Sequence, residues 1–313
     1  MRSLNAYLAL LRPGSWIKNV FIAPGVLLAV YFGEVSDSRH LAPAAILAFV
    51  CACLTASSNY VINQIFDAEG DSHHPDKRYR PLPSGRIARG RAWVLWAALG
   101  MAGLSLAAQL GRSVFASCAL LWLMGLAYNV PPVRLKDLPY VDALAESINN
   151  PIRLAIGWYA FGASRPPTLS ALLSSWMLGA FLMTSKRIAE FRRLGNPAAE
   201  AYRKSFRWYS EPRLLVSAVV YAALFGMFAG VFISRYRMEL VLGMPFVGLA
   251  MAAYFRSAFQ PNSPAMNPEK IWSSPSILVT SSIAFVICAI LLFLDVPEIA
   301  ETFAPQFPLR AIP

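Results

Sequence analysis

A group of acids followed by a group of cations lies within residues 63–86, which read NQIFDAEGDSHHPDKRYRPLPSGR. Asn63, Asp67 and Asp71 are spaced four residues apart, so on a helix they would lie along one face. Clustered acids repel one another unless a cation joins them, and Mg²⁺ prefers hard oxygen ligands together with phosphate. The stretch therefore indicates a site for magnesium and diphosphate, and a solvated charged loop is the alternative. The acids are Asp67, Glu69, Asp71 and Asp76, and the cations after them are Lys77, Arg78, Arg80 and Arg86.

A second polar stripe lies within an apolar stretch, at Asp142, Glu146, Asn149 and Arg153. Their spacings of four, three and four residues place these side chains on one face of a helix. Ionisable residues inside a membrane span are costly and usually face a cavity or a partner. Pro151 removes a backbone hydrogen bond in the same region and favours a kink. We interpret Asp142 and Glu146 as a second metal-facing wall, with a structural pair between helices as the alternative.

A third set of charges begins near the end of another apolar stretch, with Lys186, Arg187 and Glu190. Lysine and arginine at the mouth of a membrane helix suit phosphate oxygens. Arg192 and Arg193 follow directly, and we interpret these two as anchors at the membrane surface. The sequence therefore predicts that Lys186 and Arg187 bind substrate.

A short loop with Pro131-Pro132 is flanked by Tyr128 on one side and by Arg134 and Lys136 on the other. Tyr128 fits either a substrate contact or an aromatic residue at the membrane interface. The basic pair fits substrate or a lipid headgroup equally well. The sequence leaves both alternatives open.

Membrane-spanning helices must position these groups. The 313-residue chain is 57% hydrophobic and 14% charged, with a mean hydropathy of +0.48, whereas about 25% charged is usual in soluble domains. Stretches of about 20 apolar residues, the length that spans a bilayer, recur along its length. We predict one all-α polytopic membrane domain over residues 1–313, with about nine transmembrane helices. The expected spans are 16–33, 41–66, 91–110, 113–130, 140–163, 168–190, 212–234, 239–258 and 275–294.

The distribution of basic residues predicts the orientation. Most of the 28 lysines and arginines fall in alternate connections, which places the N-terminus in the cytoplasm by the positive-inside rule. The long polar loops then lie on the cytoplasmic side, so we expect the active site to face the cytoplasm, most simply from a bacterial-type inner membrane. We attribute the net charge of +11 to this bias and to anionic lipid, and not to a nucleic-acid partner.

These motifs together resemble the UbiA superfamily of intramembrane prenyltransferases. Asn63-x3-Asp67-x3-Asp71 is similar to its first Asp-rich motif, HPDKRYRPLPSGRI to the segment that follows, and Tyr128 with PPVRLK to the loop before the second motif. The resemblance implies nine helices around a central cavity and Mg²⁺ that holds a substrate diphosphate between two Asp-rich motifs. The second motif here is Asp142-x3-Glu146 instead of a pair of aspartates, and which of the two faces the metal stays open.

Within that superfamily, RPGSWIKN, SKRIAE and AYRKSFRWYS resemble the decaprenyl-phosphate phosphoribosyltransferase branch. That resemblance implies a transferase that joins phosphoribosyl pyrophosphate to a polyprenyl phosphate. The implied catalytic residues are Asp67, Asp71, Asp142 and Glu146, and the metal ligands are these four with Asn63. The implied substrate-binding residues are Lys18, Asn19, Lys77, Arg78, Arg80, Tyr128, Lys136, Arg153, Lys186 and Arg187.

Two alternatives accompany this hypothesis. The first is transfer of a prenyl group from a prenyl diphosphate to an aromatic or lipid acceptor. The second is a secondary transporter, because kinked helices and buried charges also mark ion pathways, although the internal repeat common in transporters is not evident here. A homo-oligomer is compatible with the sequence.

Overall fold

The structure is a computed structural model that describes residues 2–35, 41–72, 77–195, 203–261, 263–266 and 268–303. In this part of the chain every regular element is helical, which confirms the all-α prediction. The α-helices are α1 (Arg2–Leu11), α2 (Ile22–Tyr31), α3 (Leu41–Ser72), α4 (Arg89–Leu110), α5 (Arg112–Asn129), α6 (Val141–Ser147), α7 (Asn149–Tyr159), α8 (Leu169–Leu194), α10 (Glu211–Tyr236), α11 (Met244–Ser257), α12 (Pro275–Phe293) and α13 (Pro297–Thr302). The 3-10 helices are η1 (Pro13–Phe21), η3 (Lys77–Tyr79), η4 (Leu135–Asp137), η5 (Lys204–Trp208), η6 (Met238–Gly243) and η7 (Pro268–Ser273).

Six helical stretches of the described residues are long and apolar enough to cross a membrane. They correspond to η1 with α1 and α2, to α3, to α4, to α10, to η6 with α11, and to α12. The other expected spans coincide with α5, with the pair α6 and α7, and with α8. Helices α6 and α7 contain 7 and 11 residues, so each is shorter than a bilayer span. Helix α8 carries several of the charged residues singled out above, which lower its mean hydropathy. The count of nine therefore stays a prediction.

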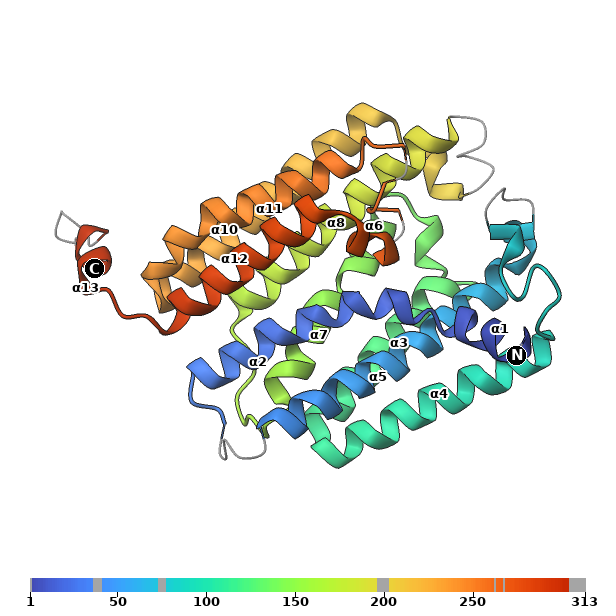
Figure 1. The fold of residues 1–313 in the computed structure, drawn as a ribbon, viewed down its shortest axis with the longest axis horizontal. Coiled ribbons are helices and arrows are strands. Elements are labelled where there is room, and N and C mark those ends of the chain that lie inside the picture. The colour runs from blue at the N-terminus through green and yellow to red at the C-terminus, as the bar shows by residue number, and fades with distance from the viewer. Residues whose placement is uncertain are drawn as a thin grey trace.

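The helices form two groups that face each other (Figure 1). On one side α3 packs on α4 and α5, and α2 packs on α7. On the other side α8 packs on α10, and α11 packs on α12. Contacts of α7 with α8, and of α12 with α2, join the two groups.

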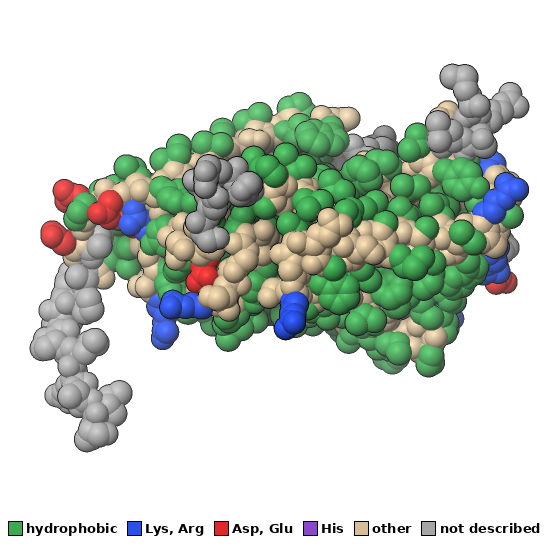
Figure 2. Space-filling view, turned by 90° about the horizontal axis from the view of Figure 1, so that it is seen from below, with side chains coloured by type: hydrophobic (Ala, Val, Ile, Leu, Met, Phe, Trp, Pro, Cys, Tyr) green, Lys and Arg blue, Asp and Glu red, His purple; other side chains and the backbone are tan. Residues whose placement is uncertain are grey.

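The outer surface of this bundle is mainly apolar. Figure 2 shows hydrophobic side chains over most of one long face, with charged side chains mainly toward its ends. Large apolar residues such as Val94 on α4, Val219 on α10 and Ile290 on α12 are more than half exposed. An exposed apolar surface of this extent fits contact with lipid tails.

The polar stripe at 142–153 lies on an interrupted helix. Helix α6 ends at Ser147 and α7 begins at Asn149. The physical cause is Pro151, which has no N–H to donate to the carbonyl group of Ser147 four residues earlier. Helix α7 is held close to α2 by Gly157, because a Cβ atom there would lie 2.2 Å from the carbonyl oxygen of Ile22. The break and this close crossing fix the stripe against the N-terminal helices.

Candidate active site

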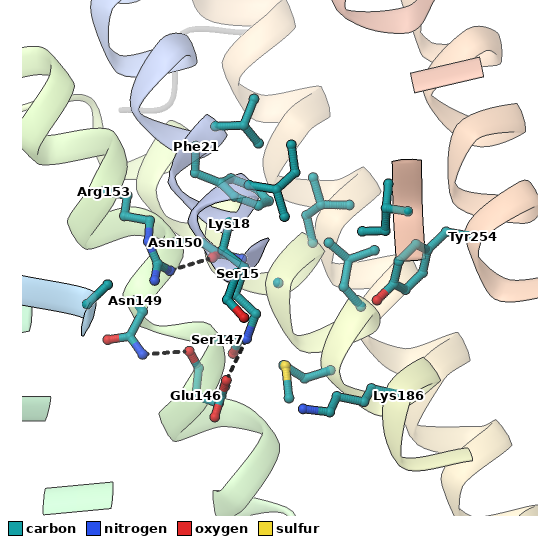
Figure 3. A pocket seen from close by; sticks show the side chains of 18 of the residues that line it. Ser15, Lys18, Phe21, Glu146, Ser147, Asn149, Asn150, Arg153, Lys186 and Tyr254 are labelled. Atoms are coloured by element: carbon teal, nitrogen blue, oxygen red, sulfur yellow. Dashed lines mark hydrogen bonds and ion pairs between the residues drawn. The ribbon is translucent and has the colours of Figure 1, made fainter. Parts of the chain in front are cut away.

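A cavity of about 710 Å³ lies between the two groups of helices. One side of its wall is polar and comes from η1, α3, α5, α6, α7 and α8, whereas the other side is largely apolar and comes from α11 and α12. Figure 3 shows Glu146, Asn149 and Arg153 along one wall and Tyr254 on the opposite wall. The basic residues of the wall are Arg12, Lys18, Lys77, Arg80, Arg153, Lys186, Arg187 and Arg203, and its carboxylates are Asp67 and Glu146.

The first acidic motif contributes Asn63 and Asp67 to the wall, but not Asp71. Residues eight apart on an α-helix are rotated by about 80°, so the stripe turns away from the cavity before it reaches Asp71. Asp71 is buried and its carboxylate accepts a hydrogen bond from Arg80 at 2.6 Å. Arg80 itself lines the cavity, so Asp71 acts on the cavity wall through that side chain.

Asp67 is surrounded by donors. Its Oδ1 accepts hydrogen bonds from Lys136 Nζ at 2.6 Å and from Arg134 at 3.0 Å. Its Oδ2 accepts from Asn63 Nδ2 at 3.1 Å. Lys136 is buried and does not itself line the cavity, and it also donates to Asn129. Burial lowers the pKa of Lys136 to about 8, and the Asp67 carboxylate opposes this shift.

The two acids of the second motif have different surroundings. Glu146 lines the cavity and forms an ion pair with Lys18 at 3.0 Å, drawn as a dashed line in Figure 3. Asp142 is fully buried and does not line the cavity. Its carboxylate pairs with Arg187 at 2.7 Å, lies 3.6 Å from Arg203 and accepts a hydrogen bond from the Tyr209 hydroxyl. In the described structure Glu146 is therefore the acid of this motif that a ligand can reach.

Arg187 is the centre of a buried network of ion pairs and hydrogen bonds at the cavity wall. Its guanidinium pairs with Asp142 and with Glu190, the latter at 2.8 Å, and donates to the Tyr128 hydroxyl at 3.0 Å. Arg203 also donates to Tyr128, at 3.1 Å. Burial and the Asp142 carboxylate raise the pKa of Tyr209, so its hydroxyl keeps its proton and donates to Asp142. This network fixes the position of the Arg187 side chain, which lines the cavity.

The remaining predicted residues divide into two groups. Lys77, Arg153 and Lys186 line the cavity, whereas Asn19 and Arg78 do not. Asn19 is buried and accepts a hydrogen bond from Arg153 Nε at 2.8 Å, so it supports a wall residue from behind. Arg78 is exposed and donates to the hydroxyl of Tyr79. Asp76, the fourth acid of the first cluster, lies outside the described residues.

Several cavity residues were not candidates from the sequence alone. Arg203 lines the cavity beside Tyr128. Arg134, for which the sequence left substrate and lipid headgroup open, does not line the cavity but pairs with Asp67. Both stand inside the quoted motifs AYRKSFRWYS and PPVRLK, but their charge alone does not separate them from the surface anchors nearby. Ser15 and Asn59 also line the cavity. These two neutral residues carry no charge that would mark them within an apolar stretch.

The carboxylate and amide oxygens of the wall are suited to bind Mg²⁺ together with a phosphate group of the substrate. In the described part of the chain no three His, Cys, Asp or Glu side chains come together to hold a metal ion alone. Mg²⁺ is commonly held by one or two carboxylates plus substrate phosphates and water. Asn63, Asp67 and Glu146 supply such oxygens on the wall, next to cations suited to phosphate. The residues therefore fit a complex of Mg²⁺ with a diphosphate better than a free ion.

Comparison with known proteins agrees with this architecture. A profile of the UbiA prenyltransferase family matches residues 20–274. The chain is 32% identical over 228 residues to decaprenyl-phosphate phosphoribosyltransferase from Mycolicibacterium smegmatis, across 70% of this chain and 68% of that protein. It is 29% identical over 229 residues to the protein of the same name from Mycobacterium tuberculosis, across 70% of this chain and 72% of that protein.

A solved structure shares the fold. A UbiA homolog from Archaeoglobus fulgidus, bound to DMAPP and Mg²⁺, superposes with a TM-score of 0.67 at 20% identity, across 91% of this chain and 99% of that one. The resemblance drawn from the acidic and basic motifs is thereby confirmed. The chain has long apolar helices and a central cavity with one polar side. It belongs to the UbiA prenyltransferase family and is an integral membrane transferase.

Proposed function

We propose that this protein transfers a phosphoribosyl group from phosphoribosyl pyrophosphate to a polyprenyl phosphate. The carrying observation is the excess of cations on the polar wall of the cavity. Phosphoribosyl pyrophosphate bears a diphosphate and a separate phosphate, so it needs more cationic partners than a prenyl diphosphate does. Similarity to decaprenyl-phosphate phosphoribosyltransferases supports the same donor. The cations concerned are Lys77, Arg80, Lys186, Arg187 and Arg203.

The donor phosphates would bind where the basic residues are already held in place. Arg187 is anchored by Asp142, Glu190 and Tyr128, so little rotamer freedom is lost when its remaining N–H groups bind an anion. Lys186, the neighbouring residue, lies 4.0 Å from Glu190 and also lines the cavity. The planar guanidinium and the mobile ammonium would together neutralise a diphosphate.

The lipid acceptor would occupy the apolar side of the cavity. Residues of α11 and α12 there offer aromatic and aliphatic surface, including Met251, Tyr254 and Phe285. A polyprenyl chain is insoluble in water and gains free energy when it is covered by such surface. Its phosphate would then lie toward the cationic wall, next to the donor.

In the transfer step, the bond between the ribosyl carbon and the diphosphate oxygen breaks as a lipid phosphate oxygen forms a bond to that carbon. The diphosphate leaves with the electron pair, and the ionised lipid phosphate needs no base. Lys77, Lys186 and Arg187 would stabilise the negative charge that grows on the leaving group. Mg²⁺, held by Asn63, Asp67 and Glu146, would supply further positive charge to it. The apolar side of the cavity would keep water away from the electron-poor carbon.

We propose that the reaction takes place at the cytoplasmic side of a bacterial-type inner membrane. The bias of lysine and arginine toward alternate loops supports this orientation. Phosphoribosyl pyrophosphate is highly charged and soluble in water, so this donor would reach the protein from the cytoplasm. Membership of a transferase family leaves the transporter alternative without support.

The test uses the full chain in lipid nanodiscs with a polyprenyl phosphate and Mg²⁺. Labelled phosphoribosyl pyrophosphate and labelled prenyl diphosphate are offered separately, and lipid products are identified by mass spectrometry. We expect a phosphoribosyl lipid from the first donor, and we expect Lys186→Met to reduce its formation strongly, because Lys186 lines the cavity and lies 4.0 Å from Glu190. Arg192→Met is the matched control, because Arg192 is exposed on the same helix and pairs with Glu211. Product from prenyl diphosphate alone would overturn the proposal.

A further inference from the structure

Arg153 of α7 carries a buried positive charge that no carboxylate contacts. The residue is only 5% exposed. In the described part of the chain it takes part in no ion pair, and its polar contacts are hydrogen bonds to two asparagines. Buried arginines normally have an acid nearby, as Arg187 does in this protein, because removal of an unpaired ion from water costs much free energy. A buried cation beside a cavity therefore indicates that an anion binds there.

Two neutral amides hold the guanidinium in place. Arg153 Nε donates to Asn19 Oδ1 at 2.8 Å, and Arg153 Nη1 donates to Asn150 Oδ1 at 3.3 Å. Asn19 is itself held, because its Nδ2 donates to Cys53 Sγ at 3.1 Å. Amide oxygens orient a cation but leave its charge uncompensated. The side chain is therefore positioned in advance for a ligand.

The remaining N–H groups of Arg153 can be reached from the cavity. Arg153 lines the cavity, and Figure 3 shows it on one wall with its bond to Asn150 as a dashed line. Its Nη2 donates no hydrogen bond in the described structure, and it is not one of the fully buried polar atoms that lack a partner there. Nη2 therefore keeps accessible surface on the cavity side.

Neither carboxylate among the described wall residues pairs with Arg153. Glu146 forms an ion pair with Lys18 at 3.0 Å, and Asp67 is paired with two other cations. Glu146 and Arg153 are seven residues apart, so they share a face of the α6–α7 stretch and are separated by about 10 Å along it. An anion at Arg153 is therefore a different group from a diphosphate held with Mg²⁺ beside Glu146.

We propose that Arg153 is the centre of a subsite for a phosphate monoester, separate from the site for the diphosphate. This inference rests on the proposed function, because both substrates of that reaction carry such a group, the donor on its sugar and the acceptor on its lipid chain. A guanidinium binds phosphate oxygens through two parallel N–H groups. A prenyl diphosphate carries no monoester, so it would leave this charge unpaired.

The experiment measures binding to the full chain in lipid nanodiscs by calorimetry, with empty nanodiscs subtracted and Mg²⁺ present. Phosphoribosyl pyrophosphate and geranyl phosphate each carry a phosphate monoester, whereas inorganic pyrophosphate does not. We expect Arg153→Met to weaken binding of at least one of the first two probes about 10- to 100-fold, the value of a charged hydrogen bond. Pyrophosphate binding should stay within about twofold of wild type. A loss for phosphoribosyl pyrophosphate assigns the subsite to the donor, and a loss for geranyl phosphate assigns it to the lipid.

The matched control is Arg237→Met, which also removes one arginine. Arg237 pairs with Glu239 and Asp295 and does not line the cavity, so binding of all three probes should stay within about twofold of wild type. Equal weakening of the three probes by Arg153→Met, unchanged binding of all three, or an equal loss in Arg237→Met would overturn the subsite.

If Arg153→Met fails to fold, competition in the wild-type protein tests the same separation of sites. Ribose 5-phosphate and geranyl phosphate are each titrated at rising pyrophosphate concentrations. Separate sites predict that the apparent Kd of at least one of them levels off, whereas a rise in proportion to pyrophosphate for both would overturn the subsite. Wild-type transfer is assayed in parallel. Absence of phosphoribosyl transfer refutes the proposed function, whereas transfer with unaffected binding in Arg153→Met refutes only the subsite.

Discussion

Replacement of Asp142 by Asn and of Glu146 by Gln separates the two acids of the second motif. If both bound metal, the two variants would behave alike. The structure predicts that they differ, because Asp142 pairs with Arg187 inside the protein and Glu146 faces the cavity. Asp142→Asn should mainly lower stability, and Glu146→Gln should mainly lower turnover.

The magnitudes follow from burial. The side chains of Arg187 and Asp142 are 1% and 0% exposed and lie 2.7 Å apart. Loss of one partner of such a buried pair costs about 3–5 kcal/mol, and the Asn variant should lie near the lower value because its amide oxygen still accepts from Arg187. The side chains of Lys18 and Glu146 are 24% and 23% exposed. Partly solvated pairs contribute about 0–1 kcal/mol, so Glu146→Gln should leave the free energy of unfolding almost unchanged.

The assay is thermal unfolding in one detergent at one scan rate, together with the Mg²⁺ dependence of transfer. We expect a clear fall in melting temperature for Asp142→Asn, with an unchanged Mg²⁺ concentration for half-maximal activity in the protein that remains folded. Glu146→Gln should melt like wild type and need more Mg²⁺. An Asp142→Asn protein as stable as wild type, with a raised Mg²⁺ requirement, would refute the assignment.

Three further predictions concern other parts of the cavity. Asp67→Asn should abolish turnover in folded protein, since it removes the carboxylate charge at the wall; activity retained in Mg²⁺ would contradict this. Donor affinity should fall about fivefold between pH 7 and pH 8. Burial lowers the pKa of Lys77 to about 7, although the carboxylates of Glu190 and Asp71 oppose this shift, and the neutral amine that forms above this pH no longer attracts phosphate. Titration of Lys77→Arg, which stays charged, should show a flatter profile, and an identical profile would exclude Lys77 as the cause. Gly125→Ala should cost about 1–3 kcal/mol of stability because its Cβ meets Asn59. Gly226→Ala, with open space at its Cβ, should leave the melting temperature almost unchanged.

Much of the architecture could be predicted from local pattern. Apolar length indicated the membrane helices, and each expected span coincides with a helical element or pair. The missing N–H of Pro151 indicated the interruption between α6 and α7. The count of nine could not be settled this way, because α6 and α7 are each too short to span a bilayer and charged residues lower the mean hydropathy of α8.

The residues of the site were harder to predict, because side chains that share a helix face still point in directions that differ by tens of degrees. Asn63, Asp67 and Asp71 share a spacing, yet about 80° of rotation separates the first from the last, and only the first two line the cavity. Asp142 and Glu146, four residues apart, differ by only about 40° in direction. Their different ion-pair partners place one inside the protein and the other at the cavity. Arg187, 45 residues after Asp142, holds it inside the protein, whereas Lys18, 128 residues before Glu146, meets it at the wall.

Local properties of the chain predicted the membrane class and the family, because apolar length and short motifs can be recognised without the fold. Which acids line the cavity depends on the fold. Ion pairs between distant segments set those positions, because Arg187 holds Asp142 inside the protein and Lys18 meets Glu146 at the wall.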